Sequence, residues 1–102
     1  MTTQALNKIE AKSRQLMFLA SKNWHNQRKC EVPAKNIIVS SPLYPEKLFL
    51  VHENIVFNAG SISDSSYGVY SFDKDGTFIR EEDAQELGRP FFSKMKTIKQ
   101  IK

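Results

Sequence analysis

Apolar side chains recur at three- and four-residue steps over the first part of the chain, and no glycine or proline occurs before Pro33. This spacing places them on one side of a helix, and Thr2 or Thr3 can cap its first turn. We therefore predict a long amphipathic helix over residues 4–27 that packs one side on a sheet. The predicted buried stripe consists of Leu6, Ile9, Leu16, Leu19, Ala20 and Trp24, with a gap at Ser13, and the opposite face carries Lys8, Lys12, Gln15 and Lys22.

The middle of the chain changes to short runs rich in β-branched and aromatic residues. Residues 36–40, 47–52 and 54–58 are predicted to be strands, and a polar turn or bulge divides the last two. Pro42 and Pro45 predict a loop after the first strand, because proline cannot donate a hydrogen bond to a strand ladder.

Two polar stretches are predicted to connect these elements. Residues 26–35 are expected to be a polar connection that follows the helix. Residues 59–66 consist mainly of small residues, which favour a flexible loop. This second stretch is the best candidate for a mobile contact loop.

The clearest turn signal lies in the segment from Tyr67 to Arg89. The apolar run 69–72, the turn sequence 73–76 and a second apolar run predict a β-hairpin. In that turn Gly76 takes the left-handed position that a residue with a Cβ avoids. Residues 81–87 are predicted to be a short helix that begins with acidic residues.

The order of elements predicts an α+β fold. A long N-terminal amphipathic helix would pack on a small, mostly antiparallel sheet of four or five strands, followed by a short C-terminal helix and a basic tail. Residues 1–102 are expected to form a single domain. For the tail, residues 91–102, the sequence allows a last helix using Met95, Ile98 and Ile101 or a flexible basic arm.

Composition narrows the location and class of the protein. An apolar fraction of 40% is that of a folded globular chain. No run approaches the ~18 apolar residues of a membrane span, and residues 1–20 lack the continuous apolar segment of a secretory signal. The lone cysteine, Cys30, cannot form an internal disulfide. We therefore expect a soluble, cytoplasmic protein without membrane partners.

The net charge of +4 is concentrated at the two ends of the sequence. Residues 1–35 hold seven basic and two acidic side chains, and residues 91–102 hold four lysines and no acid. Such ends can contact phosphates or an acidic protein face, or can be ordinary solvated surface.

One segment resembles a calcium-binding loop. Ser71, Asp73, Asp75, Gly76, Thr77 and Glu82 fall at positions 1, 3, 5, 6, 7 and 12 of an EF-hand loop, with Ser71 where the family has an aspartate. The resemblance implies a calcium site held by Asp73, Asp75 and Glu82. Residues 61–70, however, favour turn and strand over the entering helix of an EF-hand. A plain hairpin turn is the other interpretation, and it needs no metal or cofactor.

The sequence offers no complete catalytic pattern. Cys30 beside Arg28 would be a nucleophile only if His25 or His52 were oriented toward it. These residues lack the close spacings of zinc motifs, and the four glycines form no phosphate-binding loop. We therefore expect that the protein is not an enzyme.

Two binding functions remain. The preferred interpretation is a small interaction protein that docks onto a larger protein or protein–nucleic acid complex and modulates or inhibits it, as inhibitors from phages and mobile elements do. Edge strands in a small sheet would also allow a homodimer. The expected contact residues are Tyr44, Tyr67, Tyr70, Phe91 and Phe92, with Arg89, Lys94 and Lys96 around them, although Tyr70 and Phe91 also suit a core.

The alternative is a nucleic-acid-binding protein that uses its basic termini. Its phosphate contacts would come from lysine and arginine side chains, and its tyrosines or Trp24 would stack on bases. The chain contains no motif of the common nucleic-acid-binding modules. The candidate basic residues are Lys8, Lys12, Arg14, Arg28, Lys29, Lys94, Lys96, Lys99 and Lys102.

Overall fold

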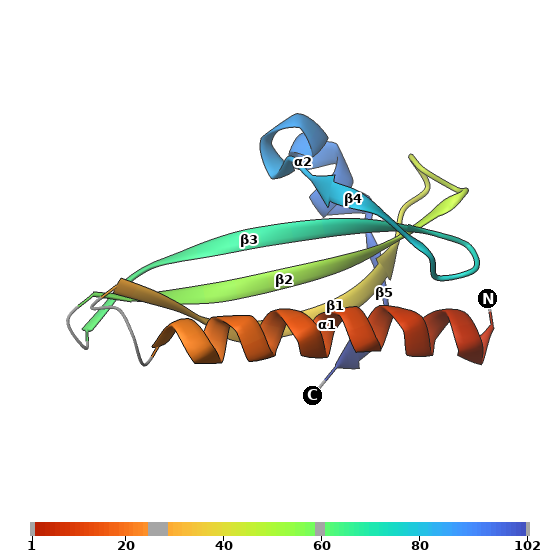
Figure 1. The fold of residues 1–102 in the computed structure, drawn as a ribbon. Helices are drawn as coiled ribbons and strands as arrows, with labels where there is room; N and C mark the ends of the chain where they lie inside the picture. The colour runs from red at the N-terminus through yellow and green to blue at the C-terminus, as the bar shows by residue number, and fades with distance from the viewer. Residues whose placement is uncertain (1, 25–28, 59–60, 102) are drawn as a thin grey trace.

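The computed structural model describes the backbone of residues 2–24, 29–58 and 61–101, and the side chains of residues 2–16, 36–53 and 68–101. The elements follow the expected α+β order (Figure 1). In sequence they are α1 (Thr3–Trp24), β1 (Lys29–Ser40), β2 (Lys47–Asn58), β3 (Ser61–Asp73), β4 (Phe78–Glu82), α2 (Ala84–Lys94) and β5 (Lys96–Ile101).

The strands form one antiparallel sheet in the order β4-β3-β2-β1-β5. Strands β1 to β4 follow one another as a meander, and β5 returns after α2 to pair with β1 at the other edge. The predicted fold class is therefore confirmed. None of the described helices is long and apolar enough to cross a membrane.

The two helices cover opposite faces of the sheet (Figure 1). Alternate residues of a strand point to opposite faces, so β1, β2 and β3 each supply both cores. The core beneath α1 contains Ile9, Ile38, Leu48, Leu50, Phe72 and Ile101. The core beneath α2 contains Ile37, Val39, Phe49, Val51, Val69 and Phe91.

Helix α1 begins where the sequence predicts. The backbone N–H of Ala5 donates to Thr2 Oγ1 at 3.1 Å, so Thr2 is the cap. Ile9 is fully buried, and the gap at Ser13 is buried as well, because this small residue faces the sheet. The side chains of Leu19, Ala20 and Trp24 lie outside the described residues.

The predicted hairpin is confirmed as β3, β4 and the turn between them. Asp73 Oδ1 accepts hydrogen bonds from the backbone N–H groups of Asp75 and Thr77, both at 2.9 Å. Gly76 has a φ of 85°, as the turn requires. An added Cβ at Gly76 would lie 2.5 Å from the carbonyl oxygen of Ala5, so the turn packs directly against the first turn of α1.

The strands are longer than predicted, and three expectations were wrong. Residues 47–58 form one strand, because the buried His52 contacts the Asn36 side chain through its Nδ1 and so satisfies a polar group inside the sheet. Strand β1 begins at Lys29 within the expected connection, and a bulge after Pro33 accommodates the proline. Strand β3 already begins at Ser61 within the expected loop.

The C-terminal segment differs from the predicted short helix at residues 81–87 and from the predicted last helix or flexible arm. The predicted helix at 81–87 begins later, since Glu81 and Glu82 belong to β4, and α2 then runs to Lys94 with a kink at Gly88. Residues 96–101 form β5 instead of a last helix or an arm. The reason is that Ile101 is buried against α1 and Ile98 packs beside it.

Candidate docking surface

The loop between β1 and β2 is a rigid platform for two exposed apolar side chains. The N–H of Tyr44 donates to the carbonyl of Ser41 at 3.2 Å, and the N–H of Lys47 donates to the carbonyl of Tyr44 at 3.1 Å. The buried Ser41 also accepts the N–H of Leu43 on its Oγ. Pro42 and Pro45 restrict the backbone further. On this loop Leu43 and Tyr44 are 43% and 36% exposed.

The Tyr44 ring rests on the core beneath α2. Its centroid lies 5.7 Å from that of Phe49 and 6.3 Å from that of Phe91. Phe91 in turn packs edge-on against Phe49 at 4.8 Å and against Phe92 at 5.2 Å. Edge-to-face contacts of this kind are favourable, so the core holds the tyrosine from one side while its other side remains exposed.

The sequence of α2 explains why Phe91 reaches this position. Asp83 caps the helix by accepting the N–H of Gln85 at 2.8 Å. Gly88 then adopts φ 71° and ψ −179°, a conformation that essentially only glycine reaches, and breaks the helix into two parts. Pro90 lies near the start of the second part of α2. After the kink at Gly88, the Phe91 side chain is buried against the sheet.

Some of the contact residues predicted for docking lie next to one another in the structure. Tyr44, Phe91 and Phe92 form one aromatic chain, although Phe91 is fully buried and therefore acts as core. Lys96 pairs with Ser40 at the base of the same loop. Arg89 and Lys94 are exposed on α2.

Of the two remaining tyrosines of the predicted set, Tyr70 does not join this surface. Tyr70 is half-buried and packs against the core beneath α1, on the opposite face of the sheet. Tyr67 lies within β3 opposite Glu53, and its side chain is outside the described residues. The sequence did not show that Tyr44 and Tyr70 lie on different faces of the sheet, because strand register decides which face a side chain occupies.

Sequence reasoning missed Leu43 and Lys47. Leu43 is one of the most exposed large apolar residues in the described part, and the available signal was a leucine held between two prolines. The Lys47 ammonium lies 5.8 Å from the Tyr44 ring centroid. It places a positive charge beside the exposed aromatic ring, where it can interact with the π system.

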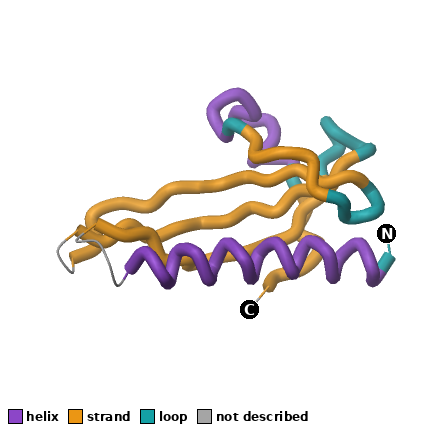
Figure 2. The backbone as a smooth tube through the Cα atoms, viewed as in Figure 1, coloured by secondary structure: helices purple, strands orange, loops and turns teal. Residues whose placement is uncertain are grey.

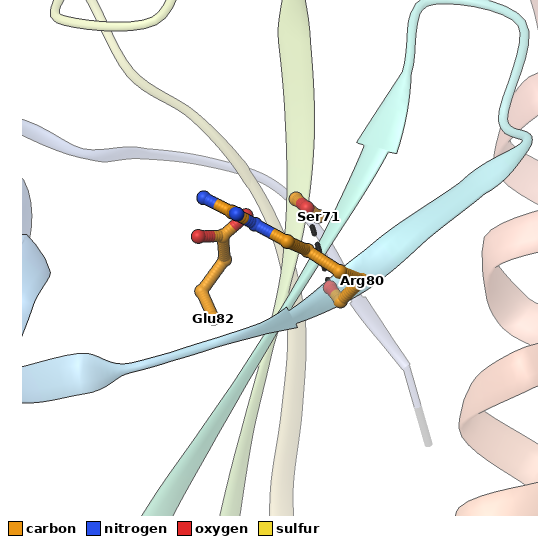
Figure 3. A network of polar contacts seen from close by, with 3 residues as sticks. All are labelled: Ser71, Arg80 and Glu82. Atoms are coloured by element: carbon orange, nitrogen blue, oxygen red, sulfur yellow. Dashed lines mark hydrogen bonds and ion pairs between the residues drawn. The ribbon is translucent and has the colours of Figure 1, made fainter.

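Ser71 of β3 forms a polar network with Arg80 and Glu82 of β4 (Figure 3). Arg80 and Glu82 line the same hollow as Tyr44. The Arg80 guanidinium donates to Glu82 Oε2 at 2.9 Å, and the Ser71 hydroxyl donates to the Arg80 carbonyl at 3.2 Å. The hydrogen bond from Arg80 lowers the pKa of Glu82 below its usual value, although partial burial acts in the opposite direction. The same pair raises the pKa of Arg80. Both groups are therefore charged at neutral pH.

This network predicts a small acid-dependent loss of stability. The pKa of Glu82 is lower in the folded state than in the unfolded chain, so the contribution of the pair is present above about pH 4.3 and is lost as pH falls through the folded value. From about pH 6 to pH 3, wild type should therefore lose more thermal stability than Glu82→Gln. Exposure of Arg80 keeps the difference small. Glu81→Gln is the control and should behave as wild type; equal losses in wild type and Glu82→Gln would contradict the prediction.

Two of the three residues of the calcium hypothesis, Asp73 and Glu82, are engaged in local contacts. Asp73 holds the turn through its Oδ1, and Glu82 pairs with Arg80. The segment before the loop is β3, which is a strand and not the entering helix of an EF-hand. Within the described residues, no three His, Cys, Asp or Glu side chains are grouped so that they could hold a metal ion.

The basic residues of the nucleic-acid alternative are divided among different surfaces. Lys8 and Lys12 line an open groove between α1 and the β3–β4 hairpin, together with Phe72 and Phe78. The Lys12 ammonium lies 4.5 Å from the Phe78 ring centroid. Phe78 is 42% exposed, so this groove combines an accessible aromatic ring with positive charge.

Other basic residues of that set lie elsewhere. Arg14 and Lys99 both pair with Glu10. Lys94 ends α2 and Lys96 begins β5. Arg28 and His25 lie outside the described residues, as do the side chains of Lys29 and Cys30. The hypothesis that Cys30 is a nucleophile therefore also concerns residues outside the described part.

Comparison with protein families, curated proteins and solved structures finds no match to this chain.

Proposed function

We propose that the protein is a non-catalytic interaction protein that docks onto a larger protein through Leu43 and Tyr44. The observation that carries the proposal is the loop of residues 41–46, which holds these two apolar side chains exposed on a backbone fixed by turns and prolines. A preorganised loop loses little conformational entropy on binding. Tyrosine is also among the residues that contribute most to protein interfaces.

The charges around the loop indicate the chemistry of the partner surface. Lys47 lies beside Tyr44, and Lys96 lies at the base of the loop. Because Glu82, Asp83 and Glu86 also line the hollow beside Tyr44, a matching partner would offer an apolar pocket for Leu43 and Tyr44 with charged residues of both signs at its rim. In this arrangement binding modulates or inhibits the partner by covering its surface.

Affinity capture from lysate of the source cells tests this proposal with matched variants. The Leu43→Ala/Tyr44→Ala protein should lose a stoichiometric protein partner that wild type retains after nuclease treatment and at raised salt. Phe78→Ala/Ile79→Ala is the control, because these residues on β4 are equally exposed, at 42% and 45%. Retention of the partner by the loop variant, or its loss in the control alone, would contradict docking through this loop.

The groove beside α1 supports a second candidate function, binding of single-stranded nucleic acid. Here Phe78 would stack on a base while Lys8 and Lys12 contact phosphates. Such binding should weaken steeply as salt rises and should be lost in Phe78→Ala/Lys12→Gln. Capture of only nuclease-sensitive material would favour this function over protein docking.

A further inference from the structure

One border of the sheet contains a stretch of strand without a neighbour. β4 lies at this border, but it pairs only with residues 69–72 of β3. Residues 61–68 of β3 pair with β2 on one side, and no strand of the described chain pairs with them on the other. In Figure 2 the strand β3 runs along the edge of the sheet, and β4 accompanies only its end near the connecting loops. The backbone of residues 61–68 is therefore an open edge.

The turn after β3 shows which backbone groups point to this border. The N–H of Asp73 donates to the carbonyl of Thr77 at 3.0 Å, and the carbonyl of Asp73 accepts the N–H of Gly76 at 3.0 Å. Both groups of Asp73 therefore point toward β4. This direction alternates from one residue of a strand to the next, and β3 pairs with β2 without a register shift over this part. The N–H and C=O groups of Ser65 and Tyr67 consequently point to the open edge.

The other edge stretches of the sheet carry residues that oppose strand pairing. Residues 29–35 of β1 also lack a second neighbour, because β5 pairs with β1 only from Asn36 onward. Lysine, proline and other charged residues on an edge discourage the addition of a further strand. Such residues are Lys29, Pro33 and Lys35 on β1, Arg80 on β4, and Lys96 and Lys99 on β5.

Residues 61–68 carry none of these protections. They include no lysine, arginine or proline, and Asp64 is their single charged residue. A register shift near Ser63 leaves residues 64–68 regularly paired with β2. Among the edges of the described sheet, this stretch is therefore the one best suited to accept another strand.

We propose that two copies of the chain pair through this stretch of β3, antiparallel and about a two-fold axis, to form one continuous sheet. An axis perpendicular to an antiparallel pair places one residue opposite itself. With Ser65 on the axis, its outward N–H and C=O bond to Ser65 of the second copy, and Asp64 stands opposite Ser66.

Neighbouring registers are less favourable. An axis at Asp64 would place two carboxylates opposite one another, which destabilises a strand pair. An axis at Ser66 would bring residues 61–63 of the second copy against β4, because β4 already pairs with residues 69–72. Charge and available edge length therefore both select the register centred on Ser65.

The pairing leaves the rest of the molecule unobstructed. Helix α1 packs mainly on β1, which is separated from β3 by β2. β3 begins opposite Asn58, at the end of β2 away from the loop of residues 41–46. Each copy therefore keeps its own docking loop exposed, and the inference does not depend on whether that loop binds a partner.

Sedimentation velocity of the full chain over a range of concentrations tests the pairing. A single strand pair is at the small end of protein interfaces, so we expect a monomer–dimer equilibrium with a dissociation constant of about 100 μM or tighter. Ser65→Lys places two like charges opposite one another and should weaken the dimer at least about fivefold. Thr97→Lys adds the same charge at an exposed position of β5 and should associate as wild type.

Disulfide formation tests the register. In a Cys30→Ser background, Ser65→Cys should give a disulfide-linked dimer on mild oxidation, because Cα atoms in a hydrogen-bonded pair lie ~5.5 Å apart, within disulfide reach. Ser61→Cys in the same background is the matched control. The two copies of residue 61 would lie ~27 Å apart along the paired strands, so this variant should not cross-link.

Four results would overturn the inference. The first is a wild-type protein that remains monomeric at about 1 mM. The second is a dimer that Thr97→Lys weakens as much as Ser65→Lys, which would indicate general charge repulsion. The others are the absence of a cross-link in Ser65→Cys and equally fast cross-linking of Ser61→Cys. Both experiments use the purified protein alone, so they are independent of any docking partner.

Discussion

Replacement of Gly76 by alanine is expected to destabilise the protein by about 3 kcal/mol. Two effects combine at this position. The φ of 85° disfavours any residue with a Cβ, and the new Cβ would lie 2.5 Å from the carbonyl oxygen and 2.7 Å from the Cα of Ala5. Because both atoms belong to the backbone of α1, either the turn or the helix must move. In a domain of this size the loss corresponds to a fall in melting temperature of at least about 10 °C.

Two further variants separate these effects. Gly76→Asn should be nearly as destabilised as Gly76→Ala, because asparagine tolerates a positive φ but has the same Cβ. Gly68→Ala should lose about 1 kcal/mol or less, since the nearest atoms to its added Cβ belong to the movable side chain of Tyr70 at 3.2 Å. A Gly76→Asn protein as stable as wild type would show that the turn does not pack against α1 in this way.

Replacement of Phe91 by alanine is expected to reduce the free energy of unfolding by about 3–5 kcal/mol. The side chain is fully buried and contacts Phe49, Phe92 and Tyr44, so its removal leaves a cavity between α2 and the sheet. Phe91→Leu preserves much of the volume and should lose less than about 1.5 kcal/mol. Urea unfolding monitored by circular dichroism measures both values, provided the slope of the transition stays constant.

Phe78→Ala is the matched control for this prediction. It removes the same atoms from a phenylalanine that is 42% exposed, so the loss should be about 1 kcal/mol or less. Amide hydrogen exchange adds a local readout, since α2 should lose protection in Phe91→Leu before the strands do. Equal destabilisation by Phe91→Ala and Phe78→Ala would contradict the assignment of Phe91 as the residue that fixes α2 to the sheet.

The sequence correctly predicted the elements that depend on residues close together along the chain. The helical spacing around Ile9, the Thr2 cap and the Gly76 turn all depend on neighbours a few residues away, and all three are present. Long-range pairing explains most of the errors. His52 looked like a turn residue because its buried partner, Asn36, lies on another strand. Lys96 to Ile101 looked helical or unstructured because β1, which pairs with it, lies far away in sequence.

The candidate docking surface was predictable only in part, because it also depends on contacts between segments that are distant in sequence. Aromatic character singled out Tyr44 and Phe92, but register and helix packing decide which aromatic rings meet. Tyr70 therefore lies on the α1 face, away from Tyr44.

The most direct test of the docking proposal is the affinity of the purified partner, once capture has identified it, for wild type, Tyr44→Ala and Phe78→Ala. Isothermal titration calorimetry would give the three dissociation constants under identical salt. We predict that Tyr44→Ala weakens binding by about 30-fold or more, as expected for an interface residue that contributes about 2 kcal/mol, while Phe78→Ala stays within about threefold of wild type. Equal affinity of wild type and Tyr44→Ala would contradict the proposal that this loop is the docking surface.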